Sequence, residues 1–330
     1  MGKRVLIAGG AGFIGSHIVD RLMKRTDMER LVVVDNFWTG LRDNLAHIRD
    51  PRLHIVQADV EKFATHEKFD EILHLASPAS PPWYMREPVR TIHANVNGAL
   101  NLIEMLVPGG RISFTSTSEV YGDPLVTPQP ESYRGFVDCT GPRSSYDESK
   151  RCTEALLFEC RRTRGTDIRI VRLFNVYGPR TRPDDGRAVS NFLSQALTNG
   201  ELTIYGDGMQ SRSWGYVDDI VDALERFFWL EQDMQYQGPL NVGNDREIPV
   251  IDVARFIVSL VPGTRLRMCP PIPQDPTNRR PDLTLCREVL PGWEARISYE
   301  EGVRRTLAWF KEQIAHGAET DAPEPVRLAG

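Results

Sequence analysis

The sequence has few cysteines, no long apolar run and no excess of basic residues. Its 330 residues include five cysteines, an odd number without Cys-x-x-Cys spacing, which argues against a disulfide framework and a zinc site. No apolar run reaches the ~20 residues that a membrane-spanning helix needs. The formal net charge is -5, so no basic field attracts nucleic acid or an anionic membrane. These absences favour a cytoplasmic protein with reduced thiols, no metal, and neither a nucleic-acid nor a membrane partner.

A glycine-rich turn near the N-terminus lies between a predicted strand and a predicted helix. The strand is the apolar run Val5–Ala8, the turn is Gly9-Gly10-Ala11-Gly12-Phe13-Ile14-Gly15, and a helical pattern follows. In this order, glycines let backbone amides approach a pyrophosphate at a helix N-terminus. A second apolar run, Leu31–Val34, ends at Asp35, whose carboxylate can accept hydrogen bonds from an adenosine ribose and would repel a 2′-phosphate. We therefore expect NAD rather than NADP.

Strand and helix patterns alternate through the first half of the chain. Further strands are predicted at residues 53–58, 71–76, 111–115 and 168–173. This alternation predicts an α/β fold with a Rossmann-type, doubly wound parallel sheet. Because the pattern becomes irregular after residue 174, we expect a smaller mixed α/β domain for substrate there. The predicted division is an NAD-binding domain at 1–174, to which later segments return, a mainly substrate-binding domain at 175–312, and a flexible tail at 313–330.

The segment after the fourth strand is rich in proline. Three prolines within Ser77–Met85 exclude a helix, so a loop is expected there. A long helix is expected from about Pro88 to Leu106. His74 lies in the apolar run before the loop, and we interpret it as a core histidine rather than a catalyst.

Tyr146 and Lys150 are four residues apart in a predicted helix that runs through Arg164, so their side chains share one face. A lysine cation beside a phenol lowers the pKa of tyrosine, which is about 10 when unperturbed, so Tyr146 is a candidate base. Alone the pair is weak evidence, because exposed helices show it by chance. Thr117 and Glu119 follow the fifth strand at the edge where a doubly wound sheet binds its ligand. The alternative for Glu119 is a carboxylate that caps a turn.

Four longer motifs lie at residues 74–82, 115–124, 141–151 and 185–192. They resemble the extended short-chain dehydrogenase/reductases that act on nucleotide sugars, and within these the branch that decarboxylates UDP-glucuronic acid. The similarity runs from Gly9 to about Phe310. It implies a Rossmann fold, NAD as cofactor and a UDP-sugar as substrate.

The resemblance also implies the members of the site. The catalytic residues would be Thr117, Glu119, Tyr146, Lys150 and Arg279. UDP would be held by Asn175, Arg187, Tyr205 and Arg212, with Arg182 and Arg279 as further substrate contacts. The complete expected NAD site consists of Gly9, Gly12, Phe13, Ile14, Gly15, Asp35, Asn36, Thr39, Gly40, Asp59, Val60, Leu75, Ala76, Ser77, Tyr146 and Lys150.

The residue after Thr117 separates reactions within this family. Relatives that dehydrate dTDP-glucose carry Thr-Asp-Glu, whereas this chain has Thr117-Ser118-Glu119, and a serine cannot be the acid that expels a hydroxyl. The resemblance therefore implies NAD-dependent decarboxylation of UDP-glucuronic acid, through a UDP-4-keto sugar, to UDP-xylose. UDP-4-keto-xylose would be released if the final reduction does not keep pace.

Two other hypotheses stay open. Related glucuronate 4-epimerases carry an arginine in the context of Arg182, so 4-epimerisation to UDP-galacturonic acid is the alternative reaction. A non-catalytic NAD-binding regulator is disfavoured because Thr117, Tyr146 and Lys150 are all present. Ser145, Ser149, Trp83 and Arg182 stand where some relatives have other side chains.

The oligomeric state follows only from the resemblance. Relatives usually dimerise through a four-helix bundle, which implies a homodimer through the helices near 88–106 and 146–164. The apolar residues of these helices could equally cover the sheet.

Overall fold

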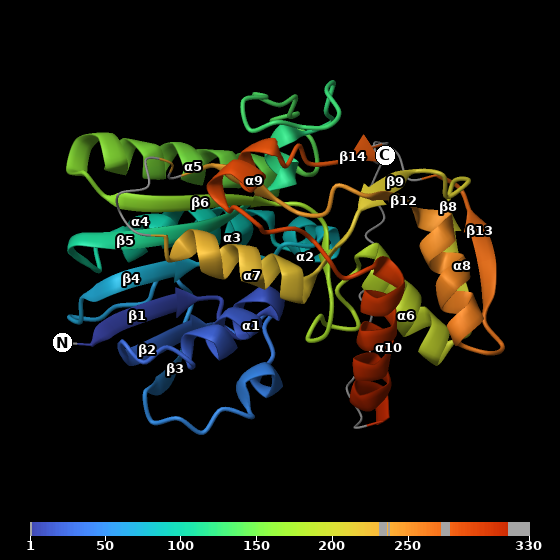
Figure 1. Ribbon diagram of the computed structural model, residues 1–330, viewed down its shortest axis with the longest axis horizontal. Helices are drawn as coiled ribbons and strands as arrows, with labels where there is room; N and C mark the ends of the chain where they lie inside the picture. The colour runs from blue at the N-terminus through green and yellow to red at the C-terminus, as the bar shows by residue number, and fades with distance from the viewer. Residues whose placement is uncertain (1, 231–235, 237, 272–277, 316–330) are drawn as a thin grey trace.

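Seven parallel strands form the central sheet, in the order β11-β6-β5-β4-β1-β2-β3 (Figure 1). The computed structural model describes residues 2–230, 236, 238–271 and 278–315. The strands are β1 (Lys3–Ala8), β2 (Met28–Asp35), β3 (Leu53–Gln57), β4 (Phe69–His74), β5 (Leu106–Thr117), β6 (Asp167–Leu173) and β11 (Leu240–Val242). This is the doubly wound Rossmann order with one added strand, so the predicted fold class is confirmed.

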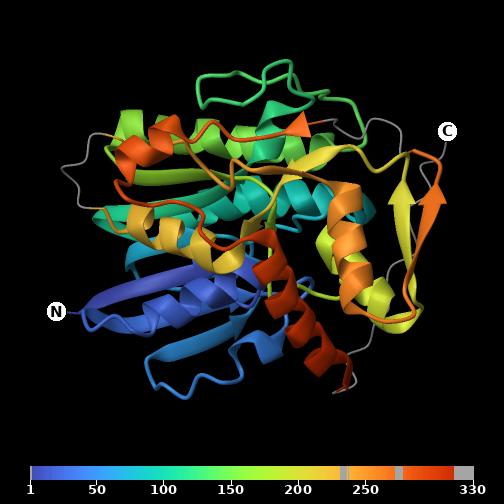
Figure 2. The same ribbon diagram turned by 45° about the vertical axis from the view of Figure 1, so that its right-hand side comes forward.

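Helices cover both faces of this sheet (Figures 1 and 2). One face carries α1 (Phe13–Leu22) and α7 (Val217–Phe228), and the other carries α4 (Gly98–Ile103) and α5 (Ser144–Arg164). In β1, Val5 and Ile7 pack with the first pair of helices, whereas Leu6 and Ala8 pack with the second pair. Since alternate strand residues point to opposite faces, a strand covered on both sides is apolar throughout. This explains the continuous apolar run in the sequence.

The proline-rich segment after β4 contains a helix, so the predicted loop is wrong for part of it. Helix α2 covers Pro81–Arg86, after an extended Ser80. Proline is compatible with the first turn of a helix, where the missing amide hydrogen has no intrahelical partner. Pro81 and Pro82 therefore start a helix instead of excluding one.

The long helix expected from about Pro88 to Leu106 consists of three consecutive parts. These are α3 (Pro88–Ile92), a π-helical turn η2 (His93–Asn97) and α4, which ends at Ile103. β5 begins at Leu106, several residues earlier than predicted. Helix α5 has the predicted extent and ends at Gly165, whose positive φ of 68° suits a left-handed cap.

Most of the chain after residue 174 lies beside the carboxyl ends of the strands (Figures 1 and 2). Three small sheets pair β7 (Val176–Tyr177) with β10 (Gly215–Tyr216), β8 (Glu201–Tyr205) with β13 (Arg265–Cys269), and β9 (Ser211–Ser213) with β12 (Glu247–Pro249) and β14 (Asn278–Arg279). The helices are α6 (Ala188–Thr198), α8 (Val250–Leu260), α9 (Thr284–Val289) and α10 (Tyr299–Ala315); single turns are η1 (Arg42–Leu45) and η3 (Ser118–Tyr121). α7 and β11 return to the large sheet, where β11 pairs with β6.

The predicted tail at 313–330 begins too early. Helix α10 continues through Ala315, and its inner face buries Leu307 and Phe310. Residues 316–330 lie outside the described residues. Within the described ranges, no helix has both the length and the apolar character that crossing a bilayer requires.

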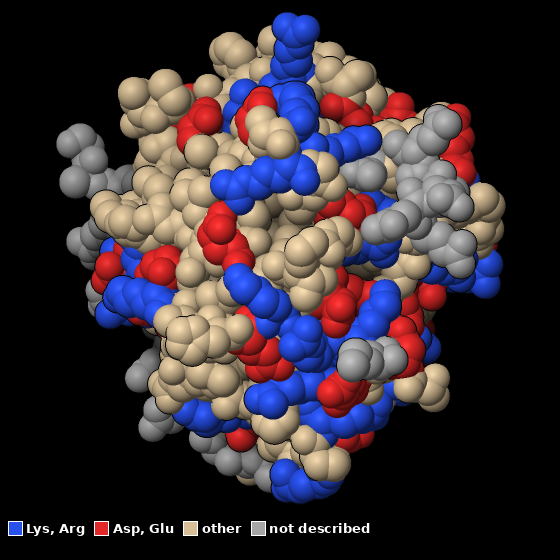
Figure 3. Space-filling model, turned by 90° about the vertical axis from the view of Figure 1, so that its left-hand side faces the viewer, with Lys and Arg blue, Asp and Glu red and all other residues tan. Residues whose placement is uncertain are grey.

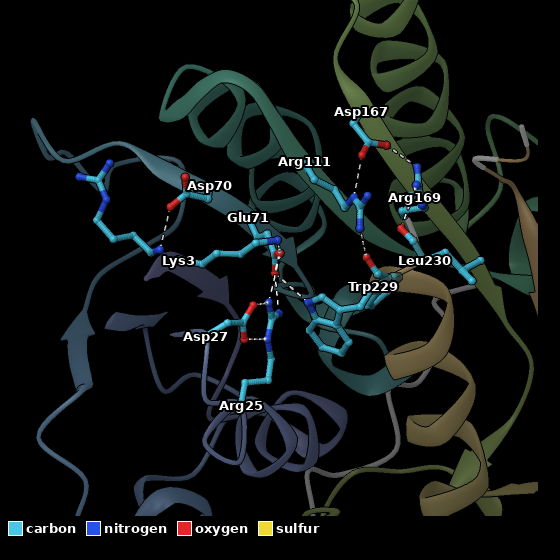
Figure 4. A network of polar contacts seen from close by, with 12 residues as sticks. Lys3, Arg25, Asp27, Asp70, Glu71, Arg111, Asp167, Arg169, Trp229 and Leu230 are labelled. Atoms are coloured by element: carbon cyan, nitrogen blue, oxygen red, sulfur yellow. Dashed lines mark hydrogen bonds and ion pairs between the residues drawn. The ribbon is translucent and has the colours of Figure 1, made fainter. Parts of the chain in front are cut away.

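The amino ends of the strands carry charges of both signs (Figure 3) and a network of ion pairs (Figure 4). Glu71, which is 4% exposed, accepts hydrogen bonds at 2.7 Å from both Arg25 Nη1 and Trp229 Nε1, and it also pairs with Lys3. Arg111 donates to the carbonyl of the last residue of α7 at 2.7 Å. The network therefore fastens the C-terminal end of α7 to the sheet.

Candidate active site

The carboxyl ends of the strands border a cavity of about 430 Å³. Its walls come from the turn after β1, the ends of β5 and β6, the start of α5 and the elements after residue 174. All expected catalytic residues line it, namely Thr117, Glu119, Tyr146, Lys150 and Arg279. All expected substrate contacts line it as well, namely Asn175, Arg182, Arg187, Tyr205, Arg212 and Arg279. The fold thus brings residues far apart in the sequence to one space.

Tyr146 and Lys150 are buried on the first turns of α5. Lys150 Nζ donates to the carbonyl oxygen of Thr115 at 2.9 Å and lies 5.8 Å from the centre of the Tyr146 ring. Burial raises the pKa of Tyr146, and a hydrogen bond with Thr117 offsets only part of this rise. Burial also lowers the pKa of Lys150 to about 7. The contacts within the protein therefore raise the pKa of Tyr146, and the prediction of a lowered pKa is wrong for the protein by itself.

Glu119 is held between two arginines. Its carboxylate forms ion pairs with Arg279 and Arg143. Arg279 is 4% exposed and also donates to the carbonyl of Gly122 at 2.9 Å. Although burial raises the pKa of Glu119, the two cations outweigh it and bring the pKa to about 2. The turn η3 is capped by the Thr117 hydroxyl, so Glu119 is an ionised side chain of the cavity and not a turn cap.

His74 and Ser149 make buried polar contacts behind the catalytic pair. His74 Nε2 lies 3.2 Å from the carbonyl oxygen of Asn95, and burial lowers its pKa to about 3. The Asn95 amide donates to Ser149 Oγ at 2.9 Å, and Ser149 Oγ donates to the backbone carbonyl of Tyr146 at 3.0 Å. The prediction that His74 is a core histidine is confirmed, because it stays neutral and away from the cavity lining.

Three residues of this region are absent from the predicted site. Tyr84 lines the cavity and stacks on Tyr146 with ring centres 5.0 Å apart and planes 8° from parallel. Asp147 follows Tyr146, and burial raises its pKa to about 7; its nearest ion-pair partner is Arg143, at 3.9 Å. Arg143 stands in the motif at residues 141–151, so its presence there was the available signal. Tyr84 offers none, because its helix was expected to be a loop.

A second cavity, of about 70 Å³, adjoins the first. The residues that line both are Gly9, Gly12, Thr39, Leu75 and Ser77. The second cavity is also lined by Asp35, Asn36, Gly40, Asp59, Val60 and Ala76, and the first by Phe13, Ile14 and Gly15. Every expected NAD-binding residue therefore lines one of two connected spaces.

The glycine turn fits a closely bound dinucleotide. A Cβ atom at Gly9, where φ is +81°, would lie 2.6 Å from the Ala76 nitrogen, and one at Gly15 would lie 2.1 Å from the Gly9 oxygen. The turn therefore excludes side chains and leaves its amides approachable. The hydroxyl of Ser77 is buried without a hydrogen-bond partner among the described residues. Such a group is expected to bind a polar ligand.

Asp35 is fixed at the wall of the second cavity. Its carboxylate accepts hydrogen bonds from the backbone amides of Ala11 and Phe37, both at 2.9 Å. Burial raises its pKa, and the two amides act in the opposite direction. The side chain is thus oriented at the end of β2, where the Rossmann fold binds a ribose.

The arginines of the substrate side have carboxylate neighbours. Arg182 bonds Asp184 through Nε at 2.7 Å and Nη2 at 2.8 Å, and Arg187 bonds Asp185 in the same two-pronged way. The Asn175 amide nitrogen is buried without a partner among the described residues. Guanidinium groups gathered beside an unsatisfied amide suit an anionic, polar ligand.

The comparisons with known proteins agree with this geometry. The pattern of the NAD dependent epimerase/dehydratase family matches residues 5–243. The chain belongs to this family of NAD-dependent enzymes.

Among curated relatives, the chain is 48% identical to UDP-glucuronic acid decarboxylase 5 of Arabidopsis thaliana over 91% of this chain and 87% of the relative. It is 40% identical to UDP-glucuronic acid decarboxylase 1 of Xenopus tropicalis, over 99% of this chain and 77% of the relative. Among solved structures, UDP-glucose 4-epimerase of Thermotoga maritima with UDP-glucose has a TM-score of 0.81 at 30% identity, covering 94% of this chain and 99% of that one. The dTDP-glucose 4,6-dehydratase DesIV of Streptomyces venezuelae, with NAD bound, has a TM-score of 0.83 at 26% identity, covering 95% and 98%.

Proposed function

We propose that the protein is an NAD-dependent UDP-glucuronate decarboxylase that forms UDP-xylose. The observation that carries the proposal is the cavity end built from Thr117-Ser118-Glu119, with Tyr146 and Arg279 beside it. Ser118 cannot be the acid of a dehydratase, and the relatives named as decarboxylases reach 48% identity over most of the chain. The reaction releases carbon dioxide and takes up one proton, so that a UDP-hexuronate becomes a UDP-pentose.

The residues that would hold NAD are those of the glycine turn, Asp35 and the shared lining of the two cavities. Bound NAD supplies a cationic pyridinium ring and the two-electron oxidation of sugar C4, which is reversed in the last step. Because the chain's own contacts keep Tyr146 a neutral phenol, positive charge beside it is needed for Tyr146 to act as base. Tyr146 Oη would then take the proton of the 4-hydroxyl, with Lys150 as the buried amine behind it.

Decarboxylation follows from the 4-ketone. The C6 carboxylate is then β to a carbonyl, so the C5–C6 bond breaks and its electrons form an enolate whose oxygen is at C4. Thr117 and Tyr146, which are hydrogen-bonded to one another, would donate to this oxygen. Since these hydroxyls are buried, their hydrogen bonds act in a site of low dielectric.

Glu119 is proposed to orient a water that protonates C5. Its pKa of about 2 means that the carboxyl has no proton of its own to donate near neutral pH. A carboxylate fixed by Arg143 and Arg279 can accept a hydrogen bond from water and aim the water's other proton at C5. The hydroxide that remains is neutralised by the one proton that the reaction takes up from solvent. Tyr146 returns its proton to the 4-oxygen when C4 is reduced.

The 4-epimerase hypothesis has less support. It needs Arg182 to grip the sugar carboxylate, but this guanidinium already makes two hydrogen bonds to Asp184 and lies over the ring of Trp83, 5.2 Å from its centre. The curated relatives reported above are named decarboxylases.

The test is to incubate the purified protein with UDP-glucuronate, with and without added NAD, and to identify the sugar nucleotides by mass. The expected product has lost the mass of carbon dioxide. An unchanged mass with a shifted retention time would mean 4-epimerisation and overturn the proposal. The ratio of UDP-4-keto-xylose to UDP-xylose measures how well the final reduction keeps pace.

We further propose a homodimer through the α3–α4 segment and α5. Val89, Ile92 and Leu100 on that segment are 64%, 42% and 47% exposed, which leaves apolar surface for a second copy. Sedimentation of the wild type and of V89D would test this: a wild-type monomer contradicts it. We also propose that residues 1–174, with the returning segments, form the NAD-binding part and that residues 175–312 form the UDP-sugar-binding part. The proposed compartment is the cytoplasm. All five cysteines are free thiols, which suits a reducing compartment.

A further inference from the structure

Two tryptophans, one in the wall of each cavity, are in contact. Trp83 of α2 lines the first cavity and Trp38, in the segment after β2, lines the second. Their rings contact edge to face, with centres 5.9 Å apart. A dinucleotide that occupies both cavities would therefore lie in spaces whose walls each contain one tryptophan of this pair. The catalytic mechanism above does not use either tryptophan.

An arginine covers each tryptophan from outside the pair. The Arg182 guanidinium lies 5.2 Å from the Trp83 ring centre, and the Arg90 guanidinium lies 4.4 Å from the Trp38 ring centre. Such cation–π contacts add to the edge-to-face contact of the rings. We call these four residues, Arg182, Trp83, Trp38 and Arg90, the tryptophan row.

Carboxylates fix both ends of the tryptophan row. Asp184 holds Arg182 through two hydrogen bonds, and Asp59 accepts from Arg90 Nη2 at 2.9 Å. Asp59 also accepts from Asn36 at 2.8 Å, and its pKa falls to about 2, chiefly through that bond, so it is ionised. The row therefore links α2 and α3 with the segment after β2 and with the segment before α6.

The segment before α6 belongs to the substrate side. Arg182, Asp185, Gly186 and Arg187 all line the first cavity. Gly186 packs so closely against Pro82 of α2 that a Cβ there would lie 2.5 Å from the proline ring. A nucleotide sugar that contacts this segment is therefore in indirect contact with α2, which carries Trp83 of the tryptophan row.

We propose that the tryptophan row retains the dinucleotide, and that a nucleotide in the substrate part of the cavity strengthens this retention. The row joins a wall of the first cavity to a wall of the second and ties together segments from the cofactor and substrate sides. Dissociation of NAD or NADH then requires the row to separate. This inference rests on NAD as the cofactor and not on which sugar reaction follows.

The test measures release of NADH from the loaded protein. Excess NAD displaces NADH in a stopped-flow instrument, and the fluorescence of the reduced nicotinamide reports the release rate with and without UDP. W83A removes one ring contact and one cation–π contact and is expected to raise the rate by about tenfold, whereas R90A removes one cation–π contact and is expected to raise it by about threefold. W83F keeps an aromatic ring and should remain near the wild type. R42A is the matched control, because Arg42 lies 4.0 Å from the Phe37 ring centre and neither residue lines either of these two cavities.

UDP is expected to slow NADH release from the wild type and to lose this effect in W83A. Wild-type release rates in folded W83A and R90A would overturn the proposal, and an acceleration in R42A as large as that in R90A would do the same. If W83A does not fold, W38A carries the same test, since Trp38 is only partly buried. If UDP does not change the rate at which the wild type releases NADH, the proposed effect of the substrate-side nucleotide on dinucleotide retention is refuted. Failure of the proposed decarboxylation would show in the mass assay and leave these rates unaffected.

Discussion

Replacing Glu119 by glutamine should cost stability and activity together. The substitution keeps the size of the side chain and removes the charge that faces Arg279 and Arg143. Arg279 is the more sensitive partner, because it is 4% exposed and its hydrogen bonds to uncharged groups are to the Gly122 carbonyl at 2.9 Å and, at 3.5 Å, to the Ser118 hydroxyl. Its cation would remain buried without a countercharge.

The size of the stability loss can be worked from these contacts. Removing one partner of a buried ion pair costs about 3–5 kcal/mol. The side chains of Glu119 and Arg143 are 18% and 31% exposed, so the lower end, about 3 kcal/mol, is expected here. With an unfolding entropy of about 2.1 cal/mol/K per residue, a chain of 330 residues would lose about 4 °C in Tm. Activity should fall by about a hundredfold or more, because C5 protonation loses its oriented water.

The pH dependence gives this prediction a sign. The folded pKa of Glu119, about 2, lies below the value of about 4.3 in an unfolded chain. The carboxylate therefore contributes stability above the unfolded pKa, and this contribution is lost as the pH falls from about 4.3 towards 2. The difference in the free energy of unfolding between the wild type and E119Q should be constant from pH 7 to pH 5 and should become smaller below pH 5.

Urea unfolding and thermal melts at several pH values are the assays for E119Q. E148Q is the matched control, since Glu148 is on the same helix as Tyr146 but its pair with Arg151, at 3.5 Å, is exposed on both sides. No measurable loss is expected for E148Q. If E119Q is as stable as the wild type at pH 7, the argument that Arg279 depends on this carboxylate is wrong.

Three further predictions follow from other parts of the structure. Y146F should abolish formation of both NADH and UDP-pentose while leaving the melting temperature nearly unchanged; retained turnover would show that Tyr146 is not the base. K150M should alter the pH dependence of stability, because the pKa of Lys150 is about 7 in the folded protein and about 10.4 in the unfolded chain. Lys150 therefore destabilises the wild type below pH 7, and the free energy of unfolding rises by at most about 1.4 kcal/mol per pH unit towards pH 10. Urea titrations of K150M should lack this rise. E71Q should cost about 3 kcal/mol because Glu71 is buried among Arg25, Lys3 and Trp229, yet leave turnover per folded molecule intact; equal stability would mean that this network does not hold α7.

The parts of the site that depend on local geometry could be predicted from the sequence. The glycine turn, Asp35 after β2, and the spacing of Tyr146 and Lys150 each follow from one helix or strand. Their places in the structure agree with those expectations. The doubly wound parallel sheet follows in the same way, from alternating patterns and right-handed crossovers.

The missed features depend on contacts between distant segments. Nothing near Glu119 in the sequence indicates that Arg143 and Arg279 will hold it, and nothing near Tyr84 indicates a stack on Tyr146. The pKa of Tyr146 was predicted from one neighbour, whereas burial by the whole fold decides it. The helix at Pro81–Arg86 was missed for a local reason, since proline was treated as a helix breaker at a position where it is a helix starter.

The return of β11 to the large sheet has a consequence for how the protein is made. Until residues 240–242 have been synthesised, β6 is an edge strand with unpaired backbone groups, and until residue 228 has been synthesised α7 cannot fully cover its face of the sheet. The nascent NAD-binding part therefore cannot complete its sheet while the ribosome is still translating the segments around α6 and β8. Synthesis of about 70 residues separates the end of β6 from its last partner, at roughly 5–20 residues per second. For those seconds the chain carries an exposed sheet edge, the kind of surface on which another chain can pair.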